Sequence, residues 1–253
     1  MRSVIMEEPG KVVVEDRPMP TLLESTDAVI KLAASCICGS DLWPYRGAQP
    51  EPVDHQQMGH EYIGEVIEVG DDVKTVKPGD FVVGSFCISC GECATCRDGY
   101  PSRCLKAIAA GDGFIGMRSN GTQAEYARIP FADGTLIKTP AYPTAEQIPH
   151  LMAASDVLGT GWYAADAAKA GPGKAIVVVG DGAVGLGAVI GAKQLGAEKI
   201  IMMSRNPKRQ ELAKQFGATH VVEERGEEGI AKVLELTDGV VAHGVVDAIG
   251  TQQ

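Results

Sequence analysis

The sequence lacks the features that mark several large classes of protein. Only 5% of its 253 residues are aromatic, and 23 basic side chains are outnumbered by 33 acidic ones, for a net charge of −10. Lys and Arg drive binding to nucleic acid and to anionic membranes, so neither partner is expected. No apolar run approaches the ~18 residues of a membrane span, and the N-terminus has no apolar segment typical of a secretory signal. We therefore expect a cytoplasmic protein.

No cysteine occurs after residue 104, and the seven in the chain are unevenly distributed. A disulfide framework would spread an even number of cysteines across the fold. Cys90, Cys93, Cys96 and Cys104 instead follow a C-x2-C-x2-C-x7-C spacing, and four thiolates close the tetrahedral shell of a structural zinc site. A [4Fe–4S] cluster normally needs x3-C-P after the third cysteine, and free thiols are the other alternative. Cys87, just outside this array, is interpreted as a strand residue.

The hydrophobic pattern divides the chain into two regions. Residues 1–150 read as short strands separated by Gly, Pro and Asp, which predicts an all-β, barrel-like domain. Thr144 and Gln147 have the spacing of a capping box that opens a helix. In residues 151–253 strands alternate with helices, which predicts a doubly wound parallel sheet and, overall, a mixed α/β fold. The strands expected in this second region are 174–179, 199–203, 220–222 and 244–249, and the helices are 183–195, 207–216 and 228–236.

A glycine-rich turn follows the first strand of the second region. Gly180, Gly182 and Gly185 form a G-x-G-x-x-G motif between a strand and a helix, with Ala183 and Val184 completing the turn. In this context the motif indicates dinucleotide binding, because the glycines permit the tight turn, the approach of a pyrophosphate and close packing of the helix on the strand. The alternative is a glycine-rich turn in an unrelated α/β domain.

The end of the next strand bears on which dinucleotide binds. A carboxylate is expected there, roughly 20 residues after the glycines, to hold the 2′-hydroxyl of a ribose. The sequence has Ser204 and Arg205 at this place. A hydroxyl and a guanidinium suit a 2′-phosphate, so the sequence favours NADP over NAD.

Two segments of the first region carry further metal-ligand types. One contains Cys38, Ser40 and Asp41, and the other contains His60 and Glu61 within a G-H-E-x2-G-x5-G pattern. A cysteine and a histidine about twenty residues apart are a weak signal alone. The glycines bracket a predicted strand, however, and this arrangement puts His60 and Glu61 at its start beside the Cys38 loop.

These segments together make the whole chain resemble the medium-chain, zinc-dependent alcohol dehydrogenases, in their NADP-preferring branch. Three motifs stand in the order typical of that family: residues 38–41 with 59–61, the four-cysteine array, and the Gly180 turn. The resemblance implies a GroES-like β-barrel catalytic domain over residues 1–150, with the zinc lobe at 87–104. It also implies a Rossmann domain over residues 151–253, which stops after its fourth strand and so looks C-terminally incomplete.

The resemblance also implies roles for single residues. Asp41 would orient His60, Ser40 would relay the substrate proton, and Thr160 would pack against the nicotinamide. The implied ligands of a catalytic zinc are Cys38, His60 and Asp156, with Glu61 as an exchangeable fourth.

The function implied by the resemblance is interconversion of an alcohol and an aldehyde or ketone by hydride transfer to or from NADP(H). Two zinc ions, a small-molecule substrate and a homodimer or homotetramer at full length go with it. A non-catalytic zinc- and nucleotide-binding fragment, or a natural short form, is the alternative suggested by the early end of the chain. A quinone or enoyl reductase is a third possibility, but these usually lack the zinc ligands.

Overall fold

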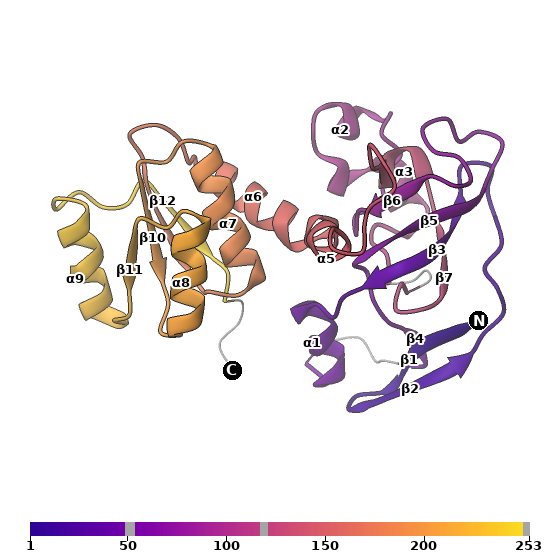
Figure 1. The fold of residues 1–253 in the computed structure, drawn as a ribbon, viewed down its shortest axis with the longest axis horizontal. Helices are drawn as coiled ribbons and strands as arrows, with labels where there is room; N and C mark the ends of the chain where they lie inside the picture. Colours follow the sequence, from indigo (N-terminus) through magenta and orange to yellow (C-terminus); the bar gives the residue numbers. More distant parts are fainter. Residues whose placement is uncertain (49–53, 117–120, 250–253) are drawn as a thin grey trace. The chain divides into compact units, whose positions relative to one another are not determined.

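The structure is a computed structural model that describes residues 1–48, 54–116 and 121–249 (Figure 1). Residues 250–253, which follow the fourth strand expected in the second region, lie outside this part. The mixed α/β fold class is confirmed. Within the described ranges, every helix is too short or too polar to cross a membrane.

The chain forms two compact units, and the division falls between Ser155 and Asp156 rather than after residue 150. Helix α5 (Ile148–Met152) accounts for the difference. Its Met152 packs with Ile63 in a buried cluster of the first unit. The segment that links the two regions therefore starts with a helix that is part of the first core.

Antiparallel sheets make up the framework of the first unit. A five-stranded sheet has the order β7-β3-β5-β6-β8, and a three-stranded sheet has the order β2-β1-β4. The strands alternate with turns at Gly, Pro and Asp, as the sequence predicts. Their bounds are β1 (Arg2–Glu8), β2 (Lys11–Asp16), β3 (Ala28–Ser35), β4 (Gln56–Gln57), β5 (Tyr62–Val69), β6 (Phe81–Gly84), β7 (Tyr126–Ile129) and β8 (Leu136–Lys138).

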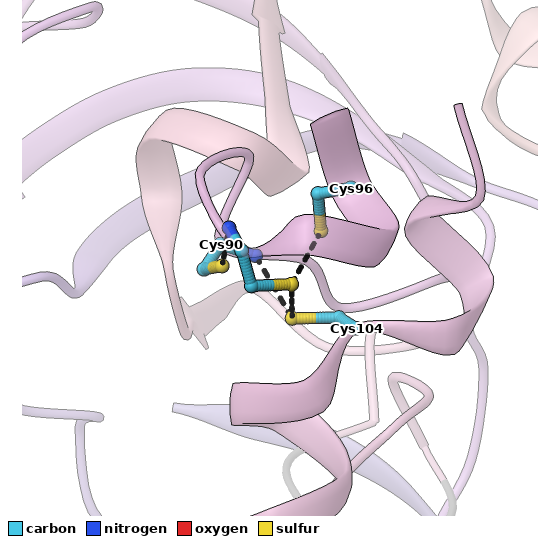
Figure 2. A group of neighbouring side chains, drawn as sticks. Cys90, Cys96 and Cys104 are labelled. Carbon is cyan, nitrogen blue, oxygen red and sulfur yellow. Dashed lines mark hydrogen bonds between the residues drawn. The ribbon is translucent and has the colours of Figure 1, made fainter. Parts of the chain in front are cut away.

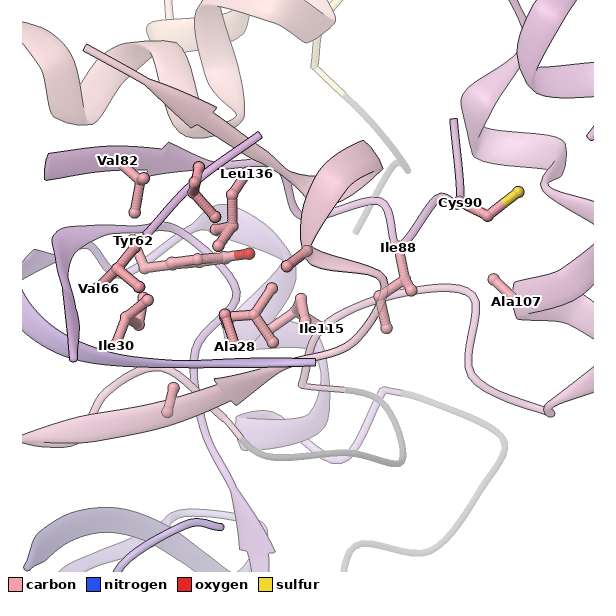
Figure 3. Close-up of a cluster of buried hydrophobic side chains, with 14 of the residues drawn as sticks. Ala28, Ile30, Tyr62, Val66, Val82, Ile88, Cys90, Ala107, Ile115 and Leu136 are labelled. Atoms are coloured by element: carbon pink, nitrogen blue, oxygen red, sulfur yellow. The ribbon is translucent and has the colours of Figure 1, made fainter. Parts of the chain in front are cut away.

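Tyr62 lies at the centre of the first core (Figure 3). Its side chain is fully buried, among residues that include Ile30 and Val66, and its hydroxyl donates to the backbone oxygen of Ser85 at 3.2 Å. Gly84 makes room for the ring, because a Cβ there would lie 1.8 Å from the Tyr62 Cε2. This core also extends to Cys90 and Ala107, so the cysteine lobe packs on the sheet.

Short helices lie in the connections of the first unit, which is therefore less purely β than the sequence predicts. The expected helix start at Thr144 is wrong. The Thr144 N–H does donate to Gln147 Oε1 at 3.0 Å, but the helix α5 begins at Ile148, because Pro149 is tolerated only in a first helical turn. The other helices of this unit are η1 (Gly39–Asp41), α1 (Leu42–Tyr45), α2 (Ala94–Arg97), η2 (Pro101–Arg103), α3 (Leu105–Ala109), α4 (Ala132–Thr135) and η3 (Ala153–Ser155).

The second unit is a parallel sheet with helices on both faces. Its strand order is β11-β10-β9-β12. Alternate residues of β9 face opposite sides: Ile176 packs in one buried cluster with α7 and α8, and Val177 packs in another with α9. The elements are α6 (Val157–Ala167), β9 (Ala175–Val179), α7 (Ala183–Gln194), β10 (Lys199–Met203), α8 (Pro207–Phe216), β11 (His220–Val222), α9 (Gly226–Leu236) and β12 (Gly244–Asp247).

Candidate metal centres and dinucleotide site

The four cysteines of the expected zinc lobe converge on one point (Figure 2). Cys93 and Cys104 precede the short helices α2 and α3, Cys96 lies within α2, and Cys90 precedes a turn. The Cys93 sulfur lies 3.4 Å from that of Cys96 and 3.9 Å from that of Cys104. The four sulfurs all lie within 4.8 Å of one another, and none is in a disulfide.

Backbone N–H groups donate to sulfurs of this lobe. The Cys90 N–H lies 3.3 Å from the Cys104 Sγ, and the Cys93 N–H lies 3.3 Å from the Cys90 Sγ. Hydrogen bonds from the Thr95 hydroxyl and the Cys96 N–H lower the pKa of Cys93 to about 5. Burial and the neighbouring Cys93 thiol raise the pKa of Cys96 to about 12. Four sulfurs this close therefore need a cation between them if all are to be thiolates.

The lobe fits zinc better than an iron–sulfur cluster. Zn–S bonds of ~2.3 Å in a tetrahedral shell put sulfurs roughly 3.8 Å apart, which the Cys93–Cys104 distance matches. Leu105 follows Cys104, where the cluster motif has proline. Cys87 lies outside the group, as expected. It lies in no strand, however, and forms only an isolated bridge with Phe114.

A second group of ligands begins with the pair Asp41 and His60. The Asp41 Oδ1 lies 3.2 Å from the Nδ1 of His60, and its Oδ2 accepts from the Cys38 N–H at 2.8 Å. The carboxylate therefore fixes the imidazole ring and leaves Nε2 to face other groups. Ser40 lies on that side, with its hydroxyl oxygen 3.2 Å from Nε2.

Gly59 shapes the backbone that delivers His60 to this place. Its φ is +94°, a conformation that L side chains rarely adopt. A Cβ there would lie 2.6 Å from the Cγ of Gln123, so the two backbones could not approach as they do. Steric constraints therefore explain why the motif has glycine directly before the histidine.

Glu61 and Asp156 complete the second group. One ligand atom from each of Cys38, His60, Glu61 and Asp156 lies within 4.8 Å of the other three. Asp156 directly follows η3, so the peptide bond to Ser155 ties it to the end of the first unit. Thiolate, imidazole and carboxylate are all zinc ligands, with bonds of roughly 2.0–2.3 Å. Both the chemistry and the spacing of these donors fit a second zinc.

The glycine-rich turn has the form needed to receive a pyrophosphate. A Cβ on Gly185 would lie 1.9 Å from the Gly180 backbone oxygen, so only glycine allows α7 to pack on the turn. A Cβ on Gly182, in contrast, would meet nothing within 4 Å. Gly182 is the N-cap of α7 and has no side chain to cap the N–H groups of the first turn, which includes Ala183 and Val184. An anion is the natural partner of such a helix terminus.

The sequence has no carboxylate at the end of β10, but the fold brings the Asp181 carboxylate beside that strand end. Ser204 is buried and donates its hydroxyl to the Oδ2 of Asp181 at 2.6 Å. Asp181 lies between the first two glycines of the motif, and its Oδ1 pairs with Arg209 Nη1 at 3.0 Å. Arg205, the other expected cofactor residue, is exposed to solvent.

Comparison with known proteins shows the family of this chain. The family model for the alcohol dehydrogenase GroES-like domain matches residues 24–141, and that for the zinc-binding dehydrogenases matches residues 183–253. The medium chain reductase/dehydrogenase ucsI of an Acremonium species is 35% identical, over 99% of this chain and 86% of that protein. The chain belongs to the medium-chain, zinc-dependent alcohol dehydrogenases.

Other members of the alcohol dehydrogenase family are similar over most of this chain. Zinc-type alcohol dehydrogenase B of Aspergillus flavus is 39% identical over 99% of this chain, which spans 58% of that relative. The solved structure of alcohol dehydrogenase TADH from Thermus sp. ATN1 is 33% identical, with a TM-score of 0.85 over 99% of this chain and 71% of that one. The GroES-like and Rossmann-type fold that the sequence predicts is thereby confirmed.

The candidate metal site around His60 makes contacts that sequence reasoning missed. The Phe86 ring meets the His60 ring edge to face, with centroids 6.3 Å apart. Gln123 Nε2 donates to the Asp41 Oδ2 at 3.4 Å. Thr160, expected to face the nicotinamide, donates its hydroxyl to the Asp156 Oδ1 at 2.8 Å. Only the Thr160 contact had a signal, since the two residues stand one helical turn apart.

Proposed function

We propose that the protein is a zinc-dependent oxidoreductase that interconverts an alcohol and an aldehyde or ketone with a nicotinamide dinucleotide. The observation that carries this proposal is the joint ligand group of Cys38, His60, Glu61 and Asp156 in a chain that also has an open glycine turn at the start of α7. A small alcohol or carbonyl compound is the proposed substrate class.

The residues of the chain supply positioning and proton transfer. Asp41 holds the tautomer of His60 in which Nε2 can ligate a metal, and Thr160 orients the Asp156 carboxylate. When bound, zinc supplies a Lewis acid that polarises the substrate oxygen. Ser40, whose hydroxyl lies beside Nε2, would relay the proton that the alcohol loses, since it passes its own hydroxyl proton on toward solvent as it takes up the new one.

The dinucleotide half of the reaction depends on the second unit. When bound, the nicotinamide supplies the acceptor or donor of the hydride. The N-terminus of α7 would hold the pyrophosphate, with Gly182 leaving room for it. Ser204 and Arg205 support the NADP preference expected from the sequence. The Asp181 carboxylate beside Ser204 opposes it. The groups around Ser204 therefore decide between NAD and NADP.

Zinc content and turnover of matched variants test this proposal. Elemental analysis should find two zinc ions per chain in the wild type and one in both Cys38→Ser and Cys96→Ser. Alcohol-dependent formation of reduced dinucleotide should disappear in Cys38→Ser, because that thiolate belongs to the catalytic group. Cys87→Ser is the matched control, since Cys87 is outside both ligand groups.

The possible outcomes separate the candidate functions. Turnover that survives Cys38→Ser would contradict the catalytic role of this zinc. Two zinc ions and dinucleotide binding without turnover of any alcohol or carbonyl compound would support the non-catalytic binding protein instead.

A further inference from the structure

Asp181 puts a carboxylate inside the glycine-rich turn. It stands between Gly180 and Gly182, in the turn that leads from β9 into α7. Its two oxygens have different partners: Oδ2 accepts from the Ser204 hydroxyl at 2.6 Å, and Oδ1 pairs with Arg209 Nη1 at 3.0 Å. The side chain is 18% exposed, so one part of it remains open to solvent and to a ligand.

The partners of Asp181 show which part of a dinucleotide it would meet. In dinucleotide-binding sheets, the residue that ends the second strand contacts the 2′-position of the adenosine ribose. Ser204 directly follows β10 and holds that position here. Because the Asp181 carboxylate lies within hydrogen-bond distance of the Ser204 hydroxyl, it puts a negative charge beside the place where a strand-end carboxylate would stand.

The charge of this group is maintained in the fold. Burial by itself would raise the pKa of Asp181, but the hydrogen bonds from Ser204 and Arg209 outweigh it and hold the pKa below its ordinary value. The nearby Arg209 is already paired, so its charge is largely compensated. A 2′-phosphate would meet an ionised carboxylate here, whereas a 2′-hydroxyl could donate a hydrogen bond to it.

We propose that Asp181 is the residue that selects the dinucleotide, by accepting the ribose 2′-hydroxyl of NAD(H) and repelling the 2′-phosphate of NADP(H). The chain then prefers NAD(H), in contrast to the preference expected from Ser204 and Arg205 alone. This inference rests on the proposed function, because it presupposes that a nicotinamide dinucleotide binds at the start of α7.

Titration of the zinc-loaded chain with NADH and NADPH, followed by their fluorescence, tests the inference without any turnover. The wild type should bind NADH more tightly. Asp181→Asn keeps the shape and an oxygen that can accept from Ser204, but it removes the charge. It should shift the ratio of the two dissociation constants toward NADPH by roughly tenfold or more, the effect of one charged hydrogen bond gained or lost.

Two further variants identify the cause of the shift. Glu211→Gln, which removes an exposed carboxylate on the same helix as Arg209, should leave the ratio unchanged. Asp181→Asn with Arg209→Gln should lose most of the gain in NADPH affinity, because the released guanidinium would be the group that binds the phosphate.

The outcomes distinguish this inference from the proposed function. A wild type that prefers NADPH, or an Asp181→Asn variant with an unchanged ratio, overturns the inference and leaves the proposed function in place. Binding of neither dinucleotide by wild type and variants, with the fold intact by circular dichroism, overturns both.

Discussion

Single carboxylates determine much of the chemistry of this molecule. Asp41 orients the His60 imidazole, and Asp181 links the glycine-rich turn to Ser204 after β10. Asp133, in α4, accepts a hydrogen bond from the Thr75 N–H. Each accepts hydrogen bonds from groups far away in the sequence, so its effect depends on the complete fold. Replacing a carboxylate by its amide keeps the shape and removes the charge, which makes such variants sensitive tests.

Asp41→Asn should weaken zinc binding at the Cys38 group. The Nδ1 of His60 would lose its charged partner, and changes of this kind typically cost about 10–100-fold in metal affinity. Competition with a chelator measures the effect, and one zinc per chain should remain in the cysteine lobe. Asp16→Asn, at an exposed strand end, is the control. Equal zinc affinity in wild type and Asp41→Asn would show that Asp41 does not position His60.

Asp133→Asn should make the first unit less stable at neutral pH but not in acid. Burial raises the pKa of Asp133, but hydrogen bonds from the Thr75 and Lys74 N–H groups and the Thr75 hydroxyl bring it below the ordinary value. The stabilisation is therefore complete above the unfolded-state pKa of about 3.9 and is lost as the pH falls through the folded-state value.

Urea unfolding between pH 3 and pH 7 measures this linkage. We expect the variant to lose about 1–2 kcal/mol of unfolding free energy at pH 7, a modest figure because the site is partly exposed. The loss should shrink toward pH 3. Asp71→Asn, at an exposed turn, should show neither effect. A loss that is constant with pH would mean that the charge of Asp133 is not its cause.

Among the elements, those with a continuous or strictly periodic apolar pattern could be predicted closely. β10 at Lys199–Met203 and α8 at Pro207–Phe216 have the predicted bounds. A buried strand and an amphipathic helix with proline at its start each carry their own signal. The start of α5 was predicted wrongly, because a side chain that caps a turn looks the same in sequence as one that caps a helix.

The glycine turn before α7 offers a matched pair of variants. Gly185→Ala would put a Cβ 1.9 Å from the Gly180 oxygen, so we expect a fall in unfolding free energy of about 1–3 kcal/mol. Gly182→Ala would meet no protein atom within 4 Å, so stability should hold while dinucleotide binding is lost. Thermal unfolding and fluorescence titration separate the two effects. Unimpaired dinucleotide binding by Gly182→Ala would contradict the assignment of this turn.

The whole molecule has two separate hydrophobic cores, one in each compact unit. In the first, aliphatic side chains surround Tyr62 between antiparallel strands, and in the second they cover both faces of a parallel sheet. We therefore expect contacts within each unit to give it a stability of its own.

Truncation of one core should destabilise that unit locally. Ile30 and Ile176 are fully buried, one in each core, so Ile30→Ala and Ile176→Ala should each cost about 2–5 kcal/mol. Hydrogen exchange by mass spectrometry should show faster exchange in residues 1–155 for the first variant and in 156–249 for the second. Equal acceleration throughout the chain by either variant would show that the two units unfold as one.

Motifs with fixed spacing mark the four cysteines of the lobe and, in the second group, Cys38, His60 and Glu61. Asp156 was predicted only from the resemblance to the family, and the roles of all these residues stay predictions.

The sequence did not predict the contact between Asp181 and Ser204, since 23 residues separate them and the pairing of β9 with β10, which puts Val179 beside Met203, brings them together. The edge-to-face contact between the Phe86 and His60 rings could not be predicted for the same reason. These side chains come from segments that are far apart in the sequence, so no local sequence pattern marks them.

The cysteine lobe has a consequence for the order in which the protein is made. Its four sulfurs come from residues 90–104, whereas the two edge strands of the five-stranded sheet, β7 and β8, lie at 126–129 and 136–138. A nascent chain on the ribosome would therefore present all four sulfurs of the proposed zinc site before either edge strand exists. Zinc bound at that stage would stabilise the fold of residues 90–104 before the sheet is complete. It would also protect the thiols from oxidation during synthesis.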